Sequence, residues 1–264
     1  RLPQHRREIR PMNTIASEWL KIRTLRSSYI LLALSVAAVL VAAGITALMI
    51  ADYDSSSAAE QATFAPANVG TPAIPFVQLF VVVFAALTVT GEYATGAIRG
   101  SLMAVPRRGR LLAAKLVVVG GCGLLLGQAV SFACLGLTLW LAGDRPAPIA
   151  PWQSVSEAIM PTVSEGLVMT MLALVAVGLG AVIRSSAGTL VALTGLLFVL
   201  PSMVFFLPKP WDARIFGVMP TNLAAPLAGS PNATLSSLGA GVTMLVYVLG
   251  FATAGVLFLR RRDA

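Results

Sequence analysis

The chain has 264 residues, of which 57% are hydrophobic and only 11% are charged, and its net charge at pH 7 is +8. Soluble domains carry about 25% charged residues, so this composition excludes an ordinary soluble globular domain. It indicates a membrane protein, most of whose surface is covered by lipid. The positive net charge could suggest a nucleic-acid partner. We expect none, because the basic residues cluster at the ends of apolar stretches.

The N-terminal part is basic and contains one amphipathic segment. We expect residues 1–27 to form a cytoplasmic tail and an amphipathic connecting helix. Ile15, Trp19 and Ile22 fall on one stripe of that helix. Such a stripe predicts an interfacial helix that contacts membrane lipid. The alternative is a simple N-terminal extension of the first membrane span.

Six long uncharged stretches follow, and each can supply about the 20 apolar residues that cross a bilayer core. The sequence therefore predicts an all-α polytopic membrane protein with one transmembrane domain over residues 28–262. We expect residues 213–234 to lie at the outer face of the membrane. The predicted spans are about 29–50, 74–91, 114–141, 160–183, 187–207 and 236–259.

The orientation follows from the basic residues. With six spans, sixteen of the 19 Lys and Arg residues fall on one side of the membrane. Basic loops stay in the cytoplasm, so both termini are expected inside the cell.

The spans hold few groups that could perform chemistry. The single histidine, His5, lies in the basic tail, and the chain has no GxxxxGK[ST] loop for nucleotide phosphates. We expect no catalytic residue, no metal site and no cofactor on this chain. Ion-coupled transporters usually keep ionisable groups inside the membrane. Glu165 is a candidate, but the length of its span lets it lie near the outer headgroups.

The cytoplasmic segment after the second span predicts a short helix with an apolar face. Ile98, Leu102 and Val105 can line that face, and Pro106 ends the helix. An apolar-faced helix between two spans is suited to a groove in a partner protein. The alternative is a loop on the lipid surface, held there by its basic residues.

This segment resembles the corresponding region of type-2 ABC exporter permeases, in particular those of actinobacteria. Five residues match the family's pattern after the second span: Glu92, Gly96, Pro106, Arg108 and Lys115. Residues 17–27 are similar to the family's connecting helix, and residues 178–188 are similar to the turn between spans four and five. Arg107 stands where the family usually has Ser or Thr.

The resemblance implies a non-catalytic subunit of an ATP-driven exporter in the bacterial plasma membrane. Members pair with a second permease copy, as homodimers or heterodimers, and bind separate ATPase subunits, which hold ATP and magnesium. The helix after span two would be the coupling helix that contacts the ATPase. Its implied residues are Glu92, Gly96, Ile98, Arg99, Leu102, Pro106, Arg107, Arg108 and Arg110. The alternative functions are an ion-coupled secondary transporter and a membrane assembly protein that transports nothing.

Overall fold

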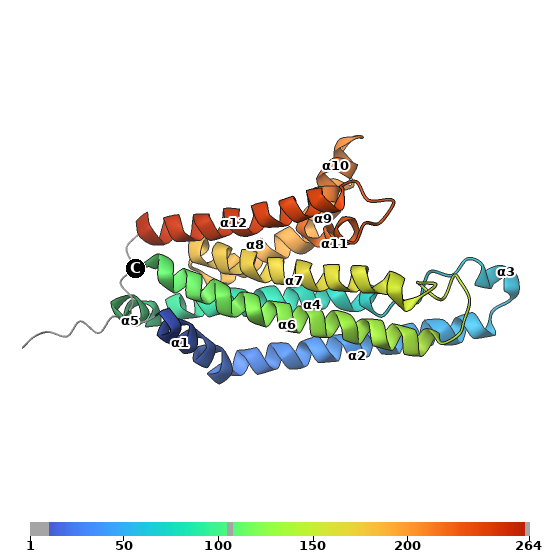
Figure 1. Cartoon of the computed structure of the whole chain (residues 1–264), viewed down its shortest axis with the longest axis horizontal. Helices are drawn as coiled ribbons and strands as arrows, with labels where there is room; N and C mark the ends of the chain where they lie inside the picture. The colour runs from blue at the N-terminus through green and yellow to red at the C-terminus, as the bar shows by residue number, and fades with distance from the viewer. Residues whose placement is uncertain (1–10, 105–107, 262–264) are drawn as a thin grey trace, which may run out of the picture.

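The computed structural model describes residues 11–104 and 108–261, and it confirms the predicted all-α architecture. Six of the helical stretches are long and apolar enough to cross a membrane. They lie roughly side by side along the longest axis of the molecule (Figure 1). Their bounds are α2 Arg26–Ser55, α4 Gly70–Ala94, α6 Arg108–Ala142, α7 Val155–Ile183, the composite stretch Ser186–Val204, and α12 Ser237–Arg261.

Helix α7 is the centre of the bundle and packs against α4, α6 and α12. Its Val168, Leu172 and Ala176 side chains are fully buried. Helices α2 and α12 are buried on much less of their surface and expose large apolar side chains. A membrane would cover these exposed faces, so the bundle needs few charges.

Glycines let the central helices approach one another closely. A Cβ atom added at Gly127 of α6 would lie 2.8 Å from the Gly166 carbonyl oxygen of α7. A Cβ atom at Gly178 of α7 would overlap the Phe251 carbonyl oxygen of α12. Small residues at such contacts are typical of helix packing in membranes, where close van der Waals contact drives association.

The fifth span is not one regular helix. It consists of α8 (Ser186–Thr194), a π-helical turn (Gly195–Val199) and α9 (Leu200–Val204). Pro201 is the second residue after the π turn. Proline has no N–H group and its ring clashes with the carbonyl four residues before it, so a wider turn at this point accommodates it.

The residues between the fifth and sixth spans fold into short helices at one end of the bundle. These are α10 (Trp211–Val218), a 3₁₀ turn (Pro220–Asn222) and α11 (Ala224–Leu227). Helix α11 packs against α7 and α12, and Leu223 beside it is fully buried. The segment that the sequence predicts at the outer face thus also contributes to the core.

Two short helices lie at the opposite end, beside the start of α6 and the end of α12 (Figure 1). They are α1 (Pro11–Thr24), next to the N-terminus, and α5 (Ala97–Ala104), between α4 and α6. The short α3 (Ala58–Gln61) lies at the far end of the molecule from them. The helix ends that carry the basic clusters therefore gather at one end of the bundle, which is called the basic end below.

Candidate functional site

Four charged side chains from three helices meet at the basic end. Lys115 of α6 donates to Glu18 of α1 and to Glu92 of α4, each over 2.6 Å. Lys21 of α1 donates to the same two carboxylates, each over 2.7 Å. Glu18, Lys21, Glu92 and Lys115 are called the charge cluster below. It contains two positive and two negative groups, so its formal charges cancel.

Three members of the charge cluster are buried. Glu18, Glu92 and Lys115 are only 4%, 9% and 3% exposed. The third hydrogen of the Lys115 ammonium group goes to the Thr88 carbonyl oxygen, 2.9 Å away, so all three donors are used. Buried charges are tolerated where they are paired and hydrogen-bonded. Separating α1, α4 and α6 would leave these charges without partners, so the cluster holds the three helices in one arrangement.

Lys21 connects the charge cluster to α5. Besides its two carboxylate partners, its ammonium group donates to the Ser101 hydroxyl of α5 over 3.3 Å. Partial burial acts to lower the pKa of Lys21, but the hydrogen bonds and charges of Glu18 and Glu92 outweigh burial and raise that pKa above its ordinary value. Lys21 therefore stays charged, and a cationic link joins α5 to α1 and α4.

The apolar face of α5 points into the protein. Ile98 is only 5% exposed and Leu102 is half-buried, whereas Arg99 is exposed and Met103 is 79% exposed. We expected Ile98 and Leu102 to face a groove in a partner, but Ile98 is already buried within this chain. Val105, the third residue of the predicted face, lies outside the described residues. The surface that α5 presents outward is formed instead by Arg99 and Met103.

The turn before α5 depends on a glycine. Helix α4 ends at Ala94, and Gly96 has a φ of 73°, in the left-handed region that glycine adopts without strain. This residue redirects the chain from α4 into α5. In α5 the buried Ile98 stands three residues before Ser101, which accepts a hydrogen bond from Lys21.

The remaining predicted residues of the coupling segment are dispersed. Pro106 and Arg107 lie outside the described residues. Arg108 donates to the Leu259 carbonyl oxygen of α12 over 2.6 Å, and Arg110 is exposed. Arg184, in the turn between the fourth and fifth spans, likewise donates to the Phe258 carbonyl oxygen over 2.9 Å. Cations here complement the partial negative charge at the C-terminal end of α12.

The predicted stripe on α1 is divided between two environments. Ile22 is buried and belongs to the main core, whereas Ile15 and Trp19 are exposed. The inner face of α1 also carries the buried Thr14 and Glu18. The helix is thus attached to the bundle partly through polar groups, and its outward apolar side chains remain available for lipid.

Sequence reasoning missed the charge cluster as a unit. It matched Glu92 and Lys115 to a family pattern, but it did not join them to each other or to Glu18 and Lys21. The available signal was Lys115, the last charged residue of a long helix, at its eighth position and followed by apolar sequence. An ionisable group in that position needs an acidic partner.

Comparisons with known proteins address the family of this chain. A family model described as ABC-2 family transporter protein matches residues 14–202. The match runs from α1 to α9 and includes the whole charge cluster and α5. The comparison with curated proteins found no match.

Proposed function

Since the chain belongs to the ABC-2 transporter family, we propose that this multi-pass permease is the non-catalytic subunit of an exporter driven by a separate ATPase. ATP and magnesium would bind to that partner, and a second permease copy would complete the translocation path. We place both termini in the cytoplasm and the spans in a bacterial plasma membrane. The basic end would then face the ATPase.

The charge cluster is the observation that carries this proposal. It connects α1 and α5 to the ends of α4 and α6 through buried, charge-assisted hydrogen bonds. A displacement of α5 by a partner would act on Lys21 through Ser101, and on the bundle through the buried Ile98. Helices α4 and α6 would move with α5, because separating either helix from the charge cluster would leave buried charges without partners.

Coupling requires that the ATPase contact the permease differently in its two states. We assign that contact to the exposed side of α5, where Arg99 and Met103 project outward, and to the exposed Arg110 at the start of α6. A complementary ATPase surface would offer an apolar hollow for Met103 and acidic groups for the two arginines. Neither α5 residue supports the core, so each can serve binding without affecting the fold.

The double variant Arg99→Glu/Met103→Asp tests this assignment. The permease and its ATPase would be co-expressed, purified together and reconstituted in vesicles. We expect the variant to lose the bound ATPase and ATP-driven transport while its thermal unfolding stays unchanged. Lys209→Glu, which makes the same charge reversal as Arg99→Glu at an exposed position at the other end, is the control. Undiminished ATPase binding and transport in the double variant would contradict the proposal.

The same vesicles separate the two alternative functions. An ion-coupled transporter would move its substrate under an ion gradient without ATP, whereas the proposed permease would not. A membrane assembly protein would neither bind the ATPase nor stimulate its hydrolysis. ATP-dependent uptake into inverted vesicles, lost when the partner's P-loop lysine is replaced, would reject both.

A further inference from the structure

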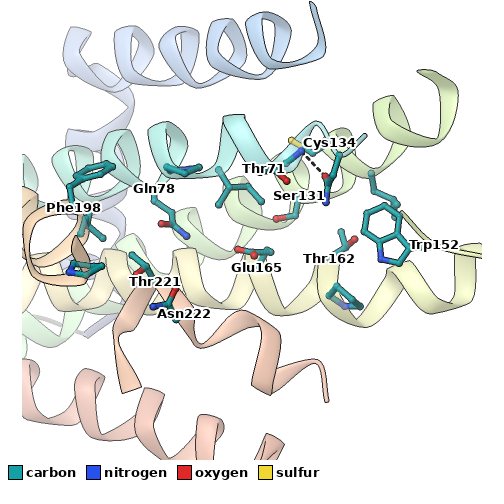
Figure 2. A pocket seen from close by; sticks show the side chains of 18 of the residues that line it. Thr71, Gln78, Ser131, Cys134, Trp152, Thr162, Glu165, Phe198, Thr221 and Asn222 are labelled. Atoms are coloured by element: carbon teal, nitrogen blue, oxygen red, sulfur yellow. Dashed lines mark hydrogen bonds between the residues drawn. The ribbon is translucent and has the colours of Figure 1, made fainter. Parts of the chain in front are cut away.

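A polar cavity of about 450 Å³ lies in the half of the bundle away from the charge cluster. It is formed by the N-terminal parts of α4 and α7, the last third of α6, the end of the fifth span and the turn that contains Asn222 (Figure 2). Small-molecule sites in proteins usually measure about 300–1,000 Å³. The cavity thus has the size of a small-ligand site, and it lies within one chain.

Glu165 lies in the middle of this cavity. Figure 2 shows its carboxylate between Gln78 and Thr221 on one side and Thr162 and Trp152 on the other. Glu165 lines this hollow ten residues, or about 15 Å, along α7 from Val155.

Several polar atoms of this lining lack a partner within the described part of the chain. The Glu165 Oε2 atom and the Ser131 hydroxyl are buried and accept or donate no hydrogen bond there. Gln78, opposite Glu165, is a buried amide on α4. Buried polar groups are normally satisfied, so unsatisfied ones around a hollow indicate a bound molecule.

The charged side chains that line the cavity are of one sign only. Its lining contains the Glu165 carboxylate and no Lys or Arg. In the charge cluster, by contrast, both buried carboxylates have lysine partners. A carboxylate away from water needs a positive partner if it is to stay ionised. The protein supplies none among the residues that line this cavity, which leaves that place for a ligand.

Aromatic side chains complete the site. Trp152 and Phe198 lie toward opposite ends of the cavity, with Glu165 between them (Figure 2). Aromatic faces attract cations and also accept apolar groups. A ligand with a positive head and an apolar body would use both properties.

We propose that this cavity binds a small organic cation, an ammonium group on an apolar body. The ammonium group donates hydrogen bonds to Glu165 and to the amide oxygen of Gln78 or the hydroxyl of Ser131. The apolar body lies against Trp152 or Phe198. This inference does not depend on coupling to an ATPase, because binding in the cavity needs only the folded permease.

The test uses three probes of nearly equal shape: phenethylammonium, 2-phenylethanol and 3-phenylpropanoate. Each is titrated calorimetrically into the full-length permease in nanodiscs of zwitterionic lipid, and empty nanodiscs correct for partition into lipid. We expect saturable binding of the cation, binding of the alcohol at least tenfold weaker, and no binding of the anion. Glu165→Gln should weaken cation binding at least tenfold. Glu157→Gln, at an exposed position on the same helix, is the matched control and should leave it unchanged.

A second variant keeps the experiment decisive if Glu165→Gln unfolds. Ser131→Leu retains the carboxylate but fills part of the cavity, and it should also abolish cation binding. Three results would overturn the proposal: no saturable binding of phenethylammonium to the wild-type chain, equal affinity for the cation and the alcohol, or undiminished cation binding by both variants. Equal protection from thermal unfolding by Na⁺ and by phenethylammonium would also refute an organic-cation site.

Discussion

Replacing Lys115 with methionine tests whether the charge cluster holds the bundle together. Methionine keeps most of the length and apolar stem of lysine but removes the ammonium group. The change deletes hydrogen bonds of 2.6, 2.6 and 2.9 Å to Glu18, Glu92 and the Thr88 carbonyl. Two buried carboxylates would then share only Lys21, whose side chain is 38% exposed.

The magnitude follows from the imbalance of charge. Breaking a buried ion pair by removing one partner costs about 3–5 kcal/mol. We therefore expect Lys115→Met to lower the free energy of unfolding by about that amount. The combination with Glu18→Gln leaves one lysine and one carboxylate, so the charges balance again. The double variant should recover about 1–2 kcal/mol relative to the sum of the two single losses.

The assay is the unfolding free energy measured by steric trapping in lipid bicelles. Lys209→Met removes a lysine from an exposed position at the other end and should change stability by less than about 0.5 kcal/mol. A loss below about 1 kcal/mol for Lys115→Met would refute the reasoning. So would a double variant whose loss equals the sum of the single losses, because the carboxylate and lysine would then act independently.

Three further predictions concern packing and orientation. Ile98→Asp should lower the free energy of unfolding by about 3 kcal/mol because the residue is buried, whereas Met103→Asp should leave thermal unfolding unchanged; equal effects would contradict the assigned faces of α5. Gly127→Ala should cost about 1–3 kcal/mol, since its new methyl group meets a backbone carbonyl of α7, and Gly121→Ala, with nothing within 4 Å, is the control for the same measurement. Arg110→Cys, in a chain without its two native cysteines, should react with a membrane-impermeant maleimide only in inverted vesicles, and labelling of intact cells would reverse the orientation.

The sequence alone predicted the number of membrane-spanning helices because span length and charge are local properties. Six apolar stretches with basic ends require no knowledge of which helix touches which. One contact of the charge cluster is also local in sequence, because Glu18 and Lys21 are three residues apart on one helix.

Long-range partners could not be predicted in this way. Lys115 pairs with Glu18, which is 97 residues away, and only the packing of α1 against α6 brings them together. The same limit applies to α5. Its sequence shows an apolar face, but whether Ile98 meets this chain or another depends on the turn at Gly96 and on the neighbouring helices. Glu165 likewise lies in a cavity whose walls come from five separate parts of the chain.

Helices α4 and α6 each carry a residue of the charge cluster and a residue of the cavity. On α4 these are Glu92 and Gln78, and on α6 they are Lys115 and Ser131. The separations are about 21 Å and 24 Å of continuous helix. A helix that tilts at one end must also move at the other end. The conformational free energies of the charge cluster and of the cavity are therefore coupled. Linkage between two binding sites is reciprocal. A ligand in the cavity that favours one tilt of α4 and α6 would change the affinity of the proposed ATPase partner for nucleotide. Nucleotide would then change the affinity of the cavity for that ligand by the same factor.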